Sequence, residues 1–100
     1  MGLKDIRVEV IRKLLEGRVL HETTRSGDID EKNLLLTGKI TVEEVIELIH
    51  ATKGPGYSTS KHHLDRSIDV HIFKAKKGES EWYIKCYLIE PDLWFISVHK

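Results

Sequence analysis

The stretch EWYIKCYLIEPDLWFISVH, residues 81–99, contains two segments in which apolar residues alternate with other residues. Such alternation is typical of strands with one buried face. Between the segments, Pro91 favours a tight turn because its ring restricts the backbone angle φ. The stretch therefore predicts two antiparallel strands, over 81–89 and 93–99.

The same alternation occurs upstream, in the segment 68–75. The sequence KKGES joins this segment to residue 81 and has the length and composition of a hairpin loop. Three consecutive strands with short links predict a three-stranded antiparallel β-meander.

Two helices are predicted before the strands. Residues 5–17 place apolar side chains at helical spacing and end in Gly17. Residues 41–52 have a broad apolar face and begin with Thr41 and Glu44, a pair that predicts a capping box. Residues 31–38 are compatible with a third, short helix, and Ser26-Gly27-Asp28 has the composition of a turn. We therefore expect an α+β fold with two or three N-terminal helices on one face of the meander.

Size and composition fit one domain spanning residues 1–100, with 40% hydrophobic and 32% charged residues. We expect no secretory leader and no membrane span, because no apolar run is long enough. Cys86 is the only cysteine and is expected to be buried, so a cytoplasmic location is the natural expectation. The segment 53–77 carries six lysines or arginines against two aspartates, a mild excess that permits contact with phosphates.

Alternation also predicts which side chains share a face of the sheet. One face is expected to form the core, with Ile68, Val70, Ile72, Trp82, Ile84, Cys86, Leu88, Trp94, Ile96 and Val98. The other is expected to be polar and aromatic, with Asp69, His71, Phe73, Tyr83, Lys85, Tyr87, Phe95, Ser97 and His99. The preceding loop is expected to bring Lys61, His62, His63 and Arg66 to the edge of this second face.

These residue types suit cleavage of RNA through its 2′-hydroxyl. That reaction needs a base, an acid and cations near the phosphate, and histidine can serve as either acid or base near neutral pH. Lysine and arginine stabilise a charged transition state, and aromatic rings stack on unpaired bases. A non-catalytic binding face and an ordinary solvated face remain open as alternatives.

A metal site would draw on the same residues. Zinc or another transition metal takes histidine and carboxylate ligands, here offered by His62, His63, Asp65, Asp69, His71 and His99. Their spacing matches no established metal motif. A metal-dependent hydrolase therefore stays an alternative, and no cofactor is expected.

Several short segments resemble the MqsR family of bacterial toxins, which are mRNA-cleaving endoribonucleases with a fold related to RelE. TTRSG at 23–27 is similar to a Thr-Arg-Ser stretch after the family's first helix, and GYSTS at 56–60 to its Phe-Tyr-Lys-Ser segment. LDRSIDVHIF at 64–73 resembles its Asp-His-x-x-Trp-Gln-Asp-Val-Tyr strand. WYIKCYLIEPDLWFISVHK at 82–100 resembles its Val-Tyr-Leu-Lys strand and closing Val-Ser-Phe-Lys.

The resemblance also suggests where the family's four proposed catalytic residues fall. The tyrosine corresponds to Tyr83 and the C-terminal lysine to His99 or Lys100. The glutamine falls near His71, and the loop lysine at Ser58, with Lys61 or His62 close by. The chain departs from the family at three of these positions, and at two of them it has histidine.

Together, these features predict a metal-independent endoribonuclease toxin that cleaves single-stranded mRNA, with an antitoxin protein as partner. His71 and His99 are the expected base and acid, in either order, and Tyr83 is expected to contact the phosphate. His62 and His63 are expected to contact substrate or to supply the second catalytic histidine. The expected substrate contacts are Ser58, Lys61, Arg66, Lys85, Tyr87 and Phe95.

Overall fold

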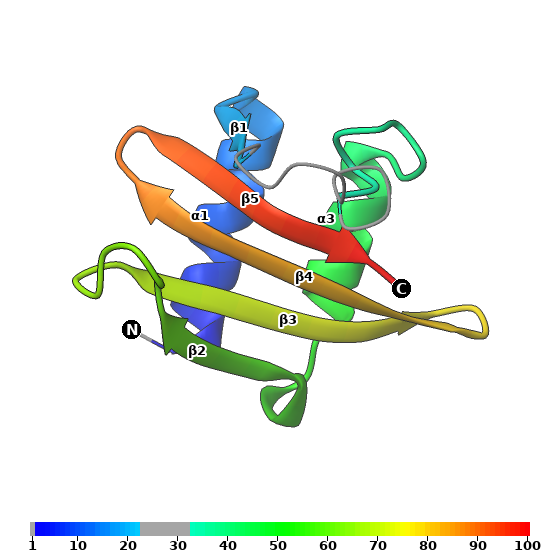
Figure 1. Cartoon of the computed structure of the whole chain (residues 1–100). Helices are drawn as coiled ribbons and strands as arrows, with labels where there is room; N and C mark the ends of the chain where they lie inside the picture. The colour runs from blue at the N-terminus through cyan, green and yellow to red at the C-terminus, as the bar shows by residue number, and fades with distance from the viewer. Residues whose placement is uncertain (1, 23–32) are drawn as a thin grey trace.

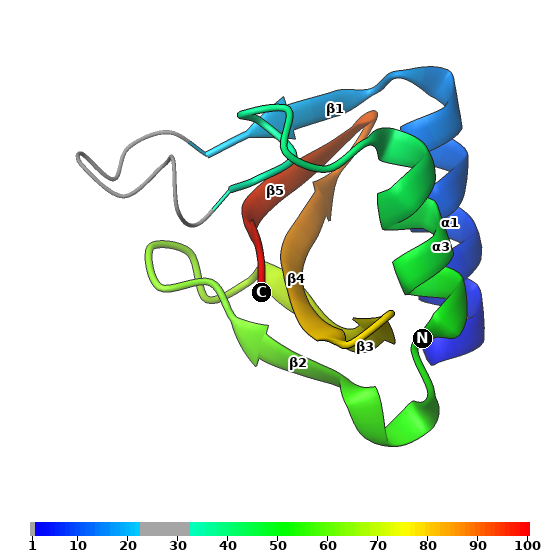
Figure 2. The same ribbon diagram turned by 90° about the vertical axis from the view of Figure 1, so that its right-hand side faces the viewer.

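The computed structural model describes residues 2–22 and 33–100 and places two helices against one face of a β-sheet (Figure 1). A side view shows the sheet as a separate layer whose ends curve toward the helices (Figure 2). Within the described ranges, neither helix is long and apolar enough to cross a membrane. The elements are α1 (Leu3–Glu16), β1 (Val19–His21), α3 (Val42–Ala51), the 3-10 turn η1 (Gly54–Gly56), β2 (Tyr57–Lys61), β3 (Asp69–Lys77), β4 (Ser80–Ile89) and β5 (Asp92–His99).

Both helices lie within two residues of their predicted bounds. α1 is followed by Gly17 as its C-terminal cap, and the φ of 74° at this residue favours glycine. α3 has the predicted capping box: the Glu44 N–H donates to the Thr41 hydroxyl, and the Thr41 N–H donates to the Glu44 carboxylate. The third helix considered for 31–38 is not seen in its described part, because Asn33 forms a β-bridge to Val98 and residues 34–38 form turns. Residues 31 and 32 and the segment 23–28 lie outside the described residues.

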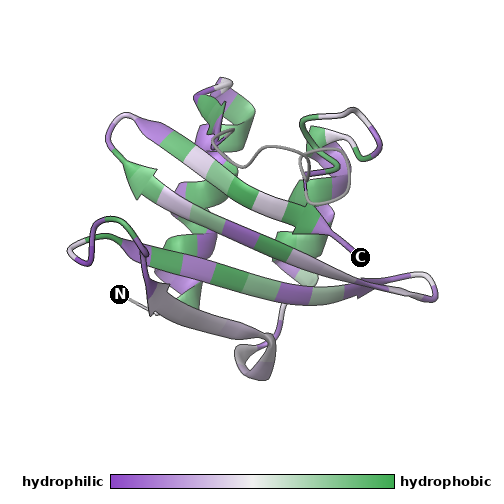
Figure 3. Cartoon of the chain, viewed as in Figure 1, coloured by the Kyte–Doolittle hydropathy of each residue, from purple (hydrophilic) through white to green (hydrophobic). Residues whose placement is uncertain are grey.

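The predicted three-stranded meander is wrong. The sheet has five strands in the order β1-β5-β4-β3-β2, and β1 runs parallel to β5, so the sheet is mixed. β2 pairs antiparallel with β3 along its whole length. The sequence signal missed both outer strands because β1 has three residues and β2 is the polar segment YSTSK, which has no alternating apolar positions (Figure 3).

The predicted division into two faces holds for β4 but not for the neighbouring strands. In β3, the residues facing the helices are His71, Phe73 and Ala75, which leaves Val70 and Ile72 on the other side. In β5, Phe95 faces the helices and Ile96 the other side, and a bulge opposite Lys85 and Cys86 then shifts the alternation. We call the side away from the helices the open face; it carries a small apolar cluster of Val70, Tyr87 and Ile96, flanked by Ile68, Ile72 and Trp94.

Gly56 links α3 to the sheet by a close backbone approach, and its replacement by alanine is expected to destabilise the fold. A Cβ at Gly56 would lie 2.5 Å from the backbone oxygen of Lys74 in β3, which would force the chain to shift. We expect Gly56→Ala to lower the free energy of unfolding by about 2 kcal/mol, as overpacking commonly does. Urea denaturation measures this, with Gly54→Ala as the matched control because a Cβ there meets nothing within 4 Å. Equal effects of the two substitutions would contradict the predicted clash.

Candidate functional site

The open face is built from rows of side chains that cross neighbouring strands. One row joins Lys74 of β3, Tyr83 of β4 and His99 of β5, which are direct partners in the strand register. The adjacent row joins Ser58, Ile72, Lys85 and Ser97, again through direct pairing. Because Tyr83 and Lys85 are two residues apart on one strand, the rows lie about 7 Å apart.

Tyr83 and His99 form the aromatic centre of the first row. Their rings stack with centroids 5.2 Å apart and planes at 25°, and both side chains are partly exposed. The ammonium of Lys74 lies 5.9 Å from the centroid of the Tyr83 ring, within cation–π range. Two positions that the resemblance marks as catalytic are therefore direct neighbours on one surface.

The hydrogen bonding of His99 determines which nitrogen can act as a base. Its Nδ1 lies 2.9 Å from the main-chain oxygen of Lys100, and this oxygen can only accept a hydrogen bond, so Nδ1 carries the proton. In the neutral ring, Nε2 then has a lone pair, and no described residue donates to it. His99 Nε2 can accept a proton from a substrate on the open face.

His71 lies on the opposite side of the sheet from His99. It is 8% exposed, and its direct partner in the strand register is the fully buried Cys86 of β4. Its Nδ1 hydrogen-bonds the Tyr57 hydroxyl at 2.8 Å, and burial lowers the pKa of His71, which favours the neutral ring. The expectation that His71 and His99 share one surface is therefore wrong, because β3 directs the His71 side chain toward the helices, whereas His99 lies on the open face.

Phe95 and Tyr87 also differ from the surface expected of them. Phe95 is fully buried against the helices, so its ring cannot stack on a base in this structure. Tyr87 is on the open face but only 6% exposed, and its ring stacks on Trp94. Arg66 is exposed in the loop between β2 and β3, and Ser58 is exposed on β2.

A buried network that the sequence analysis did not identify joins three parts of the chain. Glu22, directly after β1, accepts hydrogen bonds from Tyr87 Oη at 2.8 Å and from His62 Nε2 at 3.0 Å, both at Oε2. Its other oxygen, Oε1, is buried and has no hydrogen-bond partner among the described residues. Burial alone would raise the pKa of the Glu22 carboxyl, but the hydrogen bonds from His62 and Tyr87 outweigh it and hold the pKa below its ordinary value. Burial and the bond to Glu22 raise the pKa of Tyr87.

The same network bears on the metal alternative. Ligand atoms of Glu22, His62 and His63 lie within 4.8 Å of one another, which is a possible metal cluster. However, the Leu64 N–H donates to His62 Nδ1 at 3.1 Å, so the proton of the neutral ring is on Nε2. That nitrogen donates to Glu22 and has no lone pair for a metal, whereas a ligating histidine donates from its other nitrogen. The hydrogen bonds of His62 therefore favour a structural role.

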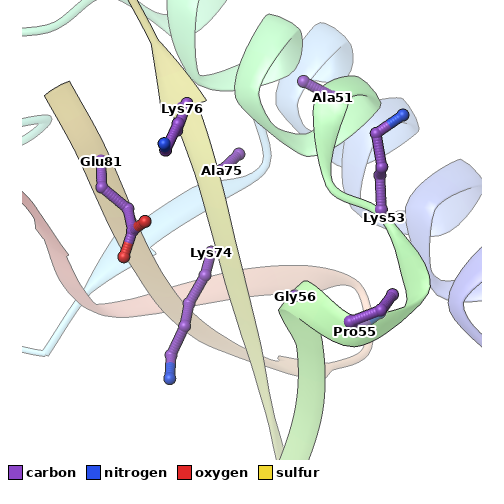
Figure 4. Close-up of a pocket in the computed structure, with 8 residues that line it drawn as sticks. All are labelled: Ala51, Lys53, Pro55, Gly56, Lys74, Ala75, Lys76 and Glu81. Carbon is purple, nitrogen blue, oxygen red and sulfur yellow. The ribbon is translucent and has the colours of Figure 1, made fainter. Parts of the chain in front are cut away.

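Two hollows flank these rows. A small one of about 160 Å³ on the open face is lined by Ser60, Lys61, His62, His63, Val70, Lys85 and Ile96. A wider one of about 640 Å³ lies between the end of α3, η1 and β3, and Lys53, Lys74 and Lys76 are among the residues that line it (Figure 4). Lys74 lines this wider hollow and also contacts Tyr83, so positive charge extends from it into the Tyr83–His99 row.

Comparison with known proteins does not assign the chain to a family. No protein-family model matches the chain, and no curated protein matches it.

Proposed function

We propose that this protein is a metal-independent endoribonuclease that cleaves single-stranded mRNA through the 2′-hydroxyl. The observation that supports this best is the stacked Tyr83–His99 pair, which lies on an exposed face between Lys74 and Lys85. It combines a proton acceptor, a hydroxyl and two cations in one place, the groups this reaction needs. The resemblance to MqsR toxins adds an antitoxin protein as the expected partner, and the single buried cysteine makes the cytoplasm the expected location.

In the proposed reaction, His99 Nε2 takes the proton of the 2′-hydroxyl, and the resulting oxygen attacks the adjacent phosphorus. The bond from phosphorus to the 5′-oxygen breaks, and the Tyr83 hydroxyl supplies the proton that this oxygen needs. The products are a 2′,3′-cyclic phosphate and a 5′-hydroxyl, and the two side chains exchange protons with water to reset. Lys74 and Lys85 offset the charge that develops on the phosphate.

This assignment replaces the pair of His71 and His99 by His99 and Tyr83. His71 lies on the helix side of the sheet, so the sheet separates it from a phosphate bound at His99. His63 is exposed and stacks on His62, which contacts Tyr87, so its aromatic contacts are with these residues and not with Tyr83 or His99.

Cleavage of a labelled single-stranded mRNA by the purified protein in EDTA tests the proposal. We expect products that end in a 2′,3′-cyclic phosphate, because the attacking oxygen belongs to the RNA. Cleavage that needs an added metal ion would instead support the metal-dependent alternative. Binding without cleavage, with ribosomes also present, would support a non-catalytic RNA-binding module.

A further inference from the structure

The loop after β2 carries two histidine rings that stack on each other. The ring centroids of His62 and His63 lie 4.8 Å apart, and the ring planes differ by only 15°. The two side chains differ in environment, because His62 is 6% exposed whereas His63 is an exposed residue. Among the described residues, no third ring stacks on His63. The pair is therefore a stack with a buried inner ring and an exposed outer ring.

The inner ring is held in place from three parts of the chain. His62 Nε2 donates to Glu22 at 3.0 Å, and His62 Nδ1 accepts from the Leu64 N–H at 3.1 Å. The Tyr87 ring of β4 packs edge-on against it, with centroids 4.9 Å apart and planes at 82°. The His62 ring cannot turn without losing these contacts. It therefore gives His63 a rigid support, which lowers the ordering cost of a ligand that binds there.

The outer ring borders the same hollow on the open face as Lys85. This hollow is also lined by Val70 and Ile96, which belong to the small apolar cluster of the open face, so His63 lies on that side of the sheet. Lys85 is two residues from Tyr83 on β4, one row away or about 7 Å. A single cationic side chain thus adjoins both the exposed histidine ring and the proposed reacting site.

We propose that His63 is a stacking platform for an unpaired base of the RNA substrate. Naming RNA rests on the proposed function, whereas the platform rests on the geometry of the two rings. Histidine is one of the side chains on which proteins stack unpaired bases, and this stacking tolerates every base because each has a π-face. A strand held at the reacting site passes Lys85, which offsets the charge of a phosphate, and places a base on His63. His63 is thus a binding residue and not a second catalytic histidine.

His63→Trp supplies a test that misfolding cannot mimic, because it predicts a gain. The probe is a fluorescein-labelled 2′-O-methyl RNA hexanucleotide, which cannot be cleaved through the 2′ position, and fluorescence anisotropy measures its affinity. We expect His63→Ala to bind it about tenfold less tightly than the wild type, the usual effect of losing one stacked base. The larger ring of His63→Trp should bind it about threefold more tightly.

Two controls separate base stacking from other effects. A hexanucleotide of the same length without bases keeps the phosphates, and its affinity should differ by less than about twofold between wild type, His63→Ala and His63→Trp. His50→Ala removes an exposed histidine from α3, away from the open face, and should leave the affinity for the complete probe unchanged. Equal losses in His63→Ala and His50→Ala would overturn the proposal. A loss in His63→Ala that persists without bases would also overturn it, because His63 would then contact the backbone.

The binding and cleavage results separate the two proposals. If the His63 variants change binding as expected but the wild type cleaves no RNA, the platform stands and the nuclease proposal fails. If RNA is cleaved but the His63 variants bind as the wild type does, the nuclease proposal stands and the platform fails. His63→Tyr keeps an aromatic ring without the imidazole and should retain both binding and cleavage. Loss of cleavage with intact binding in this variant would make the imidazole a catalytic group and overturn the assignment of His63 to stacking.

Discussion

Replacing His99 by alanine is expected to lower kcat/KM for RNA cleavage by about 10²- to 10⁴-fold, the usual effect of losing a general base. The reason is the position of His99 Nε2, which has a lone pair and faces the side of the sheet with Tyr83, Lys74 and Lys85. The stability of the fold should change little, because the His99 ring is only partly buried. Single-turnover cleavage of a labelled RNA, with the folded fraction checked by circular dichroism, measures the effect.

Two further variants distinguish a chemical role from a structural one. Tyr83→Phe keeps the ring that stacks on His99 but removes the hydroxyl, so it should retain RNA binding while cleavage slows. His71→Phe alters the opposite face of the sheet and should leave kcat/KM within about threefold for the folded protein. A loss of cleavage in His71→Phe with no loss in His99→Ala would refute the assignment of His99.

The elements that the sequence predicts well are those with a strong local period. The apolar spacing of α1, the Thr41–Glu44 capping box and the alternation in β4 are each set by residues close together in the chain. β1 and β2 have no such signal. Val19–His21 is too short to show alternation, and the polar strand Tyr57–Lys61 is held by its pairing with β3.

The face of the sheet on which a side chain lies cannot be predicted from the alternation within one strand alone, because it also depends on how the strand pairs with its neighbours. In β3, apolar residues occupy both faces, with Val70 on the open face and Phe73 in the core, so alternation alone is ambiguous. In β5, the bulge adds a residue between Phe95 and Ser97 in the pairing with β4, which reverses the alternation partway along the strand. Because of these two effects, alternation alone predicts His71 and His99 on one face, whereas the structure places them on opposite faces.

The network at Glu22 depended on long-range contacts in the same way. Glu22 is 40 residues from His62 and 65 from Tyr87 along the chain, and only the parallel pairing of β1 with β5 brings it to the open face. A single glutamate after three strand residues has no motif around it. The sequence predicts Tyr87 on the polar face of the sheet and His62 at its edge. If these side chains are buried there, each needs a hydrogen-bond partner, and this was the only indication of the network.

Replacing Glu22 by alanine is expected to lower the free energy of unfolding by about 3 kcal/mol at pH 7. The Tyr87 hydroxyl and the His62 Nε2–H would both lose a charged acceptor, and each such hydrogen bond contributes roughly 1.5–3 kcal/mol. Urea denaturation measures the loss, with Glu81→Gln as a control for removal of an exposed carboxylate. Similar losses in the two variants would show that charge rather than the network is responsible.

The pH dependence of the stability of a second variant, Glu22→Gln, tests the cause. The folded pKa of Glu22 lies below its ordinary value of about 4.5, so the unfolded chain binds the proton more readily. The carboxylate therefore contributes stability above about pH 4.5, and this contribution declines as the pH falls through the folded pKa. We expect the difference in stability between wild type and Glu22→Gln to shrink steadily from pH 5 to pH 3. A difference that stays constant over this range would mean that Glu22 stabilises the protein by packing, and the loop carrying His62 and His63 would not be held by a charged acceptor.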